Sequence, residues 1–207
     1  FVIITAYFIS MVNGKITHQE VAKILNAGGV VIFPTETLYG LGCDATNPQA
    51  LLKVYMLKKR QFGKAFPLLV RDFRMLAEYA AFNAEQKKFI SKTKQPTNFV
   101  LKAKNLSPLA TKNRTAAFRI SRNSWVKKLF QHFEKPIVAT SANISGKEPL
   151  ANPASYKEIF GNNANLIDAV VPAGVNKKKK GSKIIYNLVC SKIVPETIKK
   201  YGGIPIM

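Results

Sequence analysis

The chain has 207 residues, 47% hydrophobic and 10% aromatic, a composition typical of a globular protein with one sizeable core and not of a disordered tail. Its 32 Lys and Arg against 11 Asp and Glu give a net charge of +21, which favours polyanionic partners such as RNA. Cys43 and Cys190 have no metal-binding spacing. This argues against a zinc site or a disulfide framework and favours a reducing, cytoplasmic location.

The first ten residues form an apolar run that is too short to span a bilayer, and no basic region precedes it as in a signal peptide. We therefore interpret residues 1–10 as an extension and residues 11–207 as a single domain. We expect no membrane association.

Helix signals and apolar runs alternate along the rest of the chain. A capping box at Thr17–Glu20 predicts a first helix that ends at Gly28, and the apolar run 30–33 predicts a buried strand. Asn47 as the cap, followed by Pro48, predicts a second helix. Further helices are predicted at 74–79, 83–90, 124–130 and 154–160, and strands at 66–70, 98–103, 115–120, 136–141, 166–171 and 183–189. This order predicts a single α/β domain with a twisted, mixed sheet and flanking helices.

Common catalytic signatures are missing from the sequence. No Walker P-loop, dinucleotide-binding G-x-G-x-x-G or G-x-S-x-G elbow occurs. His18 and His132 lie outside any triad-like context, and we interpret both as helix-surface residues.

Polar clusters occur instead at the ends of predicted strands and helices. They are PTETLYGLG (34–42), LKKR (57–60), TAAFRI (115–120) and TSANISG (140–146). Ligands of open α/β sheets bind beyond strand ends, and these clusters offer hydroxyls, an amide, Lys and Arg, with Glu36 as the exceptional carboxylate. Such a set suits a nucleotide phosphate or a carboxylate. Taken singly, LKKR is also typical of a solvated helix end, and TSANISG of a plain loop.

Together, the run Gly28–Arg60 and the run Pro136–Gly146 resemble the YrdC-type threonylcarbamoyl-AMP synthases. The similarity extends from about Val21 to Ile204, and the length resembles the short, single-domain form of the family. The resemblance implies a YrdC/RibB-like α/β fold that encloses a basic cavity.

The resemblance also implies a reaction. L-threonine and bicarbonate would give N-carboxy-threonine, which attacks the α-phosphate of ATP, with Mg²⁺ accompanying the nucleotide. Pyrophosphate leaves, and the product is used to modify the tRNA adenosine next to the anticodon. The implied partners are tRNA and the tRNA-threonylcarbamoyl transferase proteins.

The resemblance assigns residues to both substrates. The implied catalytic residues, which also contact the nucleotide phosphates, are Lys58, Arg60, Ser141 and Asn143. The further implied ATP contacts are Thr115 and Lys200. The implied threonine-binding residues are Thr35, Thr37, Arg119 and Ser182, with Arg119 on the carboxylate. No metal ligand from the protein is expected.

The chain departs from the family pattern at four places, one of which is a spacing about two residues longer than usual between Arg60 and Pro67. Lys94–Asn98 reads KQPTN where the family has Pro-Gly-Pro-x-Thr, which would reshape the cavity wall. Ser182 is followed by Lys-Ile where the family has Thr-Val. Lys200 replaces a late arginine, and because Lys is the poorer bidentate clamp, we expect weaker ATP binding.

Two other functions remain open at this point. A catalytically silent RNA-binding or ribosome-maturation factor would account for the charge, and a related enzyme could adenylate a different carbamate or amino acid. Lys177–Lys180 is typical of a solvated loop, although a flap over the ATP polyphosphate or a tRNA-contacting patch fits the same residues.

Overall fold

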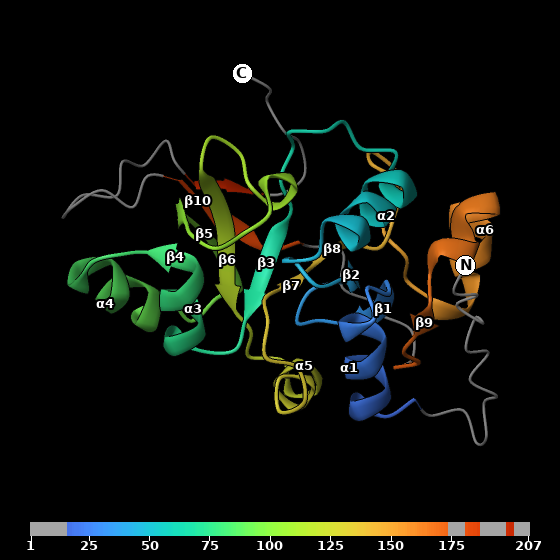
Figure 1. The fold of residues 1–207 in the computed structure, drawn as a ribbon, viewed down its shortest axis with the longest axis horizontal. Helices are drawn as coiled ribbons and strands as arrows, with labels where there is room; N and C mark the ends of the chain where they lie inside the picture. The colour runs from blue at the N-terminus through green and yellow to red at the C-terminus, as the bar shows by residue number, and fades with distance from the viewer. Residues whose placement is uncertain (1–15, 174–180, 187–197, 201–207) are drawn as a thin grey trace.

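The computed structural model describes residues 16–173, 181–186 and the backbone of 198–200 (Figure 1). The predictions for residues 1–10 and Lys177–Lys180 lie outside the described residues, as does the side chain of Lys200. Within these ranges, no helix is both long and apolar enough to cross a membrane.

The described residues form six α-helices, and the first two begin where their caps predicted. They are α1 (His18–Asn26), α2 (Pro48–Lys58), α3 (Phe73–Tyr79), α4 (Ala84–Lys92), α5 (Ser124–Leu129) and α6 (Tyr156–Phe160), with 3₁₀ turns η1 (Pro108–Ala110), η2 (Pro153–Ser155) and η3 (Gly161–Leu166). Thr17 forms the expected capping box with Glu20. The side chain of Asn47 accepts from the first backbone N–H groups of α2, so local hydrogen bonding fixes both starts.

The strands form two mixed sheets where the sequence predicted one. The smaller sheet has the order β8-β2-β1-β9, and the larger has β11-β10-β5-β6-β3-β7 with β4 paired to β5. The strands are β1 (Val31–Pro34), β2 (Tyr39–Gly42), β3 (Pro67–Val70), β4 (Ala80–Ala81), β5 (Thr97–Ala103), β6 (Thr115–Ile120), β7 (Ile137–Val138), β8 (Thr140–Ser141), β9 (Ala169–Val170), β10 (Lys183–Ile185) and β11 (Ile198–Lys200). The mixed α/β class is therefore confirmed.

The predicted strand 136–141 is divided between the two sheets at Ala139. β7 pairs antiparallel with β3 in the larger sheet, and β8 pairs antiparallel with β2 in the smaller one. The Ala139 N–H donates to the Pro67 carbonyl at 2.9 Å, so the chain leaves one sheet and enters the other within one residue. In Figure 1, β7 and β8 accordingly lie where the two sheets meet.

The sequence did not predict β2, because its two glycines read as turn residues. The structure shows a packing reason for one of them. A Cβ on Gly42 would lie 2.2 Å from the Val138 carbonyl oxygen and 2.6 Å from the Phe33 ring. Gly42 therefore allows β2 to approach β7 closely, which is a structural reason for a glycine at this position.

The core lies between the sheets and their helices. Val31, Ile32 and Phe33 of β1 are all fully buried, as the apolar run predicted. Figure 1 shows α3 and α4 beside the larger sheet and α1 beneath the smaller one, with α2 near the β8 end. Lys58, Arg119 and Ser141 lie at or next to the last residue of α2, β6 and β8 respectively.

Candidate functional site

Lys58, the last residue of α2, lies at the centre of one polar cluster. Its side chain is buried, with 2% of the residue exposed. Its ammonium donates to the Ser141 carbonyl at 2.7 Å, to the Asn143 carbonyl at 2.9 Å and to Asn143 Oδ1 at 3.0 Å. We call Lys58, Ser141 and Asn143 the lysine cluster. Because an ammonium has three donors, all three are occupied.

Asn143 connects the members of this cluster. Its Oδ1 also accepts from Ser141 Oγ at 2.6 Å, and its Nδ2 donates to the Lys147 carbonyl at 2.5 Å. The Ser145 N–H donates back to the Lys58 carbonyl at 2.9 Å. The loop after β8 is thus fastened to the end of α2 in both directions.

The buried ammonium of Lys58 has no carboxylate partner among the ion pairs of the described residues. Burial and the neighbouring Arg60 guanidinium lower the pKa of Lys58 to about 7. The three acceptor oxygens act in the other direction because they favour the charged form. The cluster therefore holds a cation whose charge is sensitive to pH near neutrality.

Arg60 organises the chain next to this cluster. Its Nε donates to the Lys64 carbonyl at 2.8 Å and its Nη2 to the Ala65 carbonyl at 3.1 Å, while the guanidinium lies 5.1 Å from the Phe66 ring centroid. The arginine thereby shapes the segment between α2 and β3. Two of its five N–H donors are used in these bonds.

A second cation, Arg119 of β6, is buried with 5% of the residue exposed. Its Nη2 lies 3.6 Å from Glu36 Oε2. Its Nε and Nη1 have no hydrogen-bond partner among the described residues. Buried polar groups are nearly always paired with protein, water or ligand, so these two donors are available for an anion.

Glu36 fixes the loop after β6 around this arginine. Its Oε1 accepts from Ser121 Oγ at 2.7 Å and from the backbone N–H groups of Arg122 and Asn123. Burial alone would raise the pKa of Glu36, but the charge of Arg119 and these hydrogen bonds lower it overall. Glu36 is therefore ionised and positions Arg119.

A residue that the sequence did not predict, Asn98, lies beside Arg119. The antiparallel ladder of β5 and β6 ends at Phe99 opposite Phe118. Asn98 and Arg119 are the next residue on each strand, so continuation of this register places their side chains on the same face. The Asn98 Nδ2 donates to Ser182 Oγ at 2.8 Å. Asn98 is 1% exposed. In the sequence, Asn98 stood out only as part of a departure from the family pattern. Its position next to Arg119 depends on the register of β5 and β6, which the sequence does not give.

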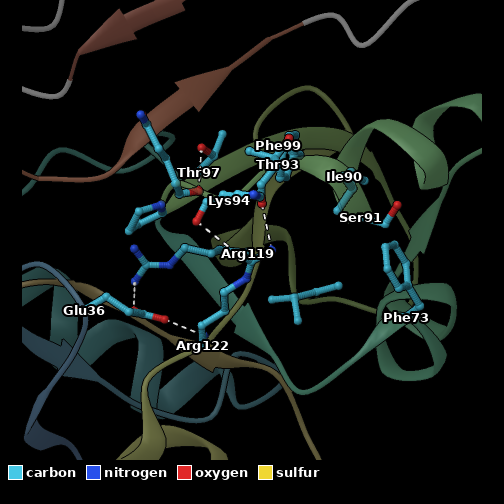
Figure 2. Close-up of a pocket in the computed structure, with 13 residues that line it drawn as sticks. Glu36, Phe73, Ile90, Ser91, Thr93, Lys94, Thr97, Phe99, Arg119 and Arg122 are labelled. Carbon is cyan, nitrogen blue, oxygen red and sulfur yellow. Dashed lines mark hydrogen bonds and ion pairs between the residues drawn. The ribbon is translucent and has the colours of Figure 1, made fainter.

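A cavity of about 290 Å³ extends from Arg119 toward α4 (Figure 2). Its walls combine apolar side chains with cations and the single carboxylate of Glu36. The lining residues are Glu36, Phe73, Ile90, Ser91, Thr93, Lys94, Gln95, Pro96, Thr97, Phe99, Arg119, Ile120 and Arg122. The guanidinium of Arg122 crosses toward the end of α4, where it donates to the Thr93 and Lys94 carbonyls at 2.9 and 3.0 Å.

Residues 23–195 match the sequence model of the Sua5/YciO/YrdC family, which carries the description "Telomere recombination". The chain belongs to this family.

Solved structures of Sua5/YciO/YrdC proteins share the fold. E. coli YciO matches with a TM-score of 0.74 at 22% identity, over 90% of each chain. P. abyssi Sua5 in complex with L-threonine matches with a TM-score of 0.73 at 26% identity. That match covers 82% of this chain and 50% of Sua5, so the chain spans half the length of that relative. Full-length HypF in its phosphate- and nucleotide-bound form matches with a TM-score of 0.71 at 20% identity, over 82% of this chain and 27% of HypF.

The two threonines of the family's PTET motif have local structural contacts. Thr35 Oγ1 donates to the Leu38 carbonyl at 2.7 Å and accepts from the Thr37 and Leu38 N–H groups at 3.2 and 3.3 Å. It also lies 3.2 Å from Thr37 Oγ1. The hydroxyl of Thr35 therefore builds the turn between β1 and β2, which is the typical use of Thr in such turns.

Thr115 lies at the opposite end of β6 from Arg119. Its hydroxyl donates to the Lys112 carbonyl at 2.7 Å. Four residues along a strand span roughly 13 Å, so Thr115 and Arg119 share a face of the sheet without contact. The structure thus groups Lys58 with Ser141 and Asn143, and it joins Ser182 to Asn98 on the strand next to that of Arg119.

The described residues contain no group of three or more His, Cys, Asp or Glu side chains that could hold a metal ion. The lysine cluster and the surroundings of Arg119 instead offer cations, hydroxyls and amides as hydrogen-bond donors. This is a donor set for oxyanions.

Proposed function

We propose that the chain synthesises L-threonylcarbamoyl-AMP from L-threonine, bicarbonate and ATP and releases pyrophosphate. The observation that carries the proposal is that Arg119 is buried with two donor nitrogens, Nε and Nη1, without a partner in the described residues. Such a guanidinium suits the planar carboxylate of an amino acid. Family membership and the threonine complex of Sua5 support the choice of amino acid.

In this proposal, the threonine nitrogen, once deprotonated, forms a bond to the bicarbonate carbon, and water leaves. A carboxylate oxygen of the resulting carbamate attacks the α-phosphorus of ATP, and the bond to the bridging oxygen of pyrophosphate breaks. Phosphoryl and nucleotidyl transfer depend mainly on positioning and charge stabilisation. Lys58 and Arg60 would provide both, and Mg²⁺ would arrive with the nucleotide as part of the substrate.

The geometry of the lysine cluster adds a requirement to this mechanism. All three donors of Lys58 are engaged with Ser141 and Asn143, so direct contact with a phosphate oxygen requires one bond to be exchanged. Asn143 Oδ1 is the side-chain acceptor among the three, so its rotation frees a donor of Lys58 without moving the backbone. The same rotation gives up the bonds of the Asn143 amide to Ser141 Oγ and the Lys147 carbonyl. We propose that binding of the triphosphate replaces the bond from Lys58 to Asn143 Oδ1 and stabilises the charged form of Lys58.

Pyrophosphate release tests the proposal. The purified chain is incubated with ATP and magnesium, and threonine or bicarbonate is omitted in turn. Release that requires both compounds is the expected result. Release without threonine would identify another acceptor, and ATP binding without release would contradict the synthase.

The net charge of +21 favours a second candidate, a silent RNA-binding factor on the same fold. Its affinity for RNA would fall steeply with salt because each contact to a phosphate releases counterions. Salt-sensitive RNA binding without ATP turnover would support this candidate. A product hand-off to tRNA-modifying proteins in the cytoplasm belongs to the first proposal and predicts turnover without RNA.

A further inference from the structure

Three buried, unpaired polar atoms lie together on one face of the larger sheet. Nε and Nη1 of Arg119 are donors, and Oδ1 of Asn98 is an acceptor, none with a hydrogen-bond partner in the described part of the chain. The two residues are 5% and 1% exposed. A buried polar group that lacks a partner lowers the stability of the folded chain, so three such atoms on one face indicate a site that binds a partner.

The orientation of the Asn98 amide follows from its neighbours. Its nitrogen faces Ser182 Oγ at 2.8 Å and the Lys183 carbonyl oxygen at 3.5 Å. A carbonyl oxygen only accepts, so the nitrogen is correctly placed on that side and the oxygen is turned away from it. Ser182 thereby fixes Asn98 with Oδ1 directed away from β10.

The donors of Arg119 and the acceptor of Asn98 would hydrogen-bond to two different groups of one ligand, an acceptor group and a donor group. The arginine suits a carboxylate, while Oδ1 of Asn98 requires an N–H or O–H donor. Cross-strand neighbours have Cβ atoms about 5 Å apart, so both groups must lie close together on the ligand. An α-amino acid has this arrangement, because its nitrogen and carboxylate are attached to the same carbon.

We propose that Asn98 is a substrate-binding residue whose Oδ1 accepts a hydrogen bond from the α-nitrogen of the amino acid that Arg119 holds by its carboxylate. The inference rests on the proposed function, because that function names L-threonine as the amino acid. It adds a subsite for the substrate nitrogen at Asn98, the position at which the family pattern Pro-Gly-Pro-x-Thr has a threonine side chain. The same bond persists after carboxylation, since the carbamate nitrogen retains one hydrogen.

The test pairs a residue change with a ligand change. Binding of L-threonine and of (R)-3-hydroxybutanoate, which lacks the α-amino group, is measured by isothermal titration calorimetry for the wild type and Asn98→Leu. Leu preserves the volume and removes the acceptor. Loss of one hydrogen bond to a charged group, converted to a ratio of dissociation constants, predicts a roughly ten- to hundredfold loss of threonine affinity. The des-amino ligand should bind both proteins equally.

Two further variants separate this role from a structural one. Asn98→Thr keeps an acceptor oxygen and should bind threonine more tightly than Asn98→Leu, by about tenfold if one such bond is restored. Asn83→Ala removes an Asn hydrogen bond at the N-terminal cap of α4, at the other end of the helix from the cavity-lining Ile90 and Ser91, and should bind threonine as the wild type does. Thermal unfolding confirms that each variant is folded.

Three results would overturn the assignment. Unchanged threonine affinity in Asn98→Leu would show that Asn98 does not contact the ligand. Equal losses for both ligands would show that the variant acts by misplacing Arg119. Absence of threonine binding to the wild type would overturn the proposed function together with this inference, whereas the first two outcomes leave that function intact.

Discussion

Asn143 accepts two hydrogen bonds from the buried ammonium of Lys58, one on its backbone carbonyl at 2.9 Å and one on Oδ1 at 3.0 Å. The two residues come from the end of α2 and from the loop after β8. Their contact joins the end of α2 to that loop. Removal of the Asn143 side chain is therefore the first prediction.

Asn143→Ala should reduce pyrophosphate release with all substrates by about 100-fold, the scale for loss of one preorganised electrostatic group. It should also lower the free energy of unfolding by roughly 1–3 kcal/mol, because the buried Lys58 ammonium loses an acceptor. Turnover assays and urea unfolding measure the two effects.

Asn83→Ala is the matched control for this change. It removes the capping bond to Gln86 N–H of α4 and should cost about 1 kcal/mol of stability with turnover unchanged. If Asn143→Ala folds and turns over like the wild type, the lysine cluster is not part of the catalytic site.

Arg60→Lys should behave much like Arg60→Ala, for which we expect about a 100-fold loss of kcat/KM for ATP. An ammonium cannot bridge the Lys64 and Ala65 carbonyls and stack on Phe66 at the same time. Steady-state kinetics with varied ATP measure the effect.

Lys64→Ala provides the control, because it removes a charge from the same segment and keeps the carbonyl that Arg60 holds. Its kcat/KM should stay near the wild-type value. A loss as large as that of Arg60→Lys would mean that summed charge, and not the geometry of Arg60, supports ATP binding.

The pH dependence of Lys58 should act on binding and stability in opposite directions. Its pKa in the folded chain is lowered to about 7 from an ordinary 10.5. Between these values the unfolded chain binds the extra proton, so the contribution of Lys58 to stability rises with pH from about 7 upward. ATP affinity should fall over the same window, because the ammonium loses its charge.

Calorimetric titration of ATP and thermal unfolding between pH 6.5 and 9 measure these trends. Lys58→Met removes the titrating group, so its difference from the wild type isolates Lys58 from the other lysines. A difference that does not change with pH would show that Lys58 keeps an ordinary pKa in the folded chain.

Glu36→Gln should destabilise the chain by roughly 1–3 kcal/mol at pH 7, because the carboxylate holds the loop after β6 and pairs with buried Arg119. The folded-state pKa of Glu36 lies below the ordinary 4.5. Its ionised form therefore contributes stability above pH 4.5, and this contribution is lost as pH falls through the folded-state pKa.

Urea unfolding at pH 7 and at progressively lower pH tests this expectation. The difference in the free energy of unfolding between the wild type and Glu36→Gln should become smaller as the pH falls. Glu148→Gln, at an exposed position, should show little effect at either pH. A constant difference for Glu36→Gln would mean that shape, and not charge, makes the contribution.

Local signals predicted most of the elements. Thr17 and Asn47 place the starts of α1 and α2 by satisfying free N–H groups within three residues, and the buried run of β1 follows from its composition. The division of strand 136–141 at Ala139 could not be predicted, because it depends on hydrogen bonds to β3 and β2. β2 was missed for a related reason: its glycines serve packing against β7, which local sequence does not reveal.

The sequence by itself determined the α/β class, the cationic character and the family, because caps, apolar runs and motifs are local along the chain. It also supplied Lys58, Ser141, Asn143 and Arg119 as candidate residues through the family motifs. Only the tertiary structure decided which of them meet. Strand register placed Asn98 beside Arg119, and burial left their polar atoms without partners, since both depend on contacts between segments far apart in sequence.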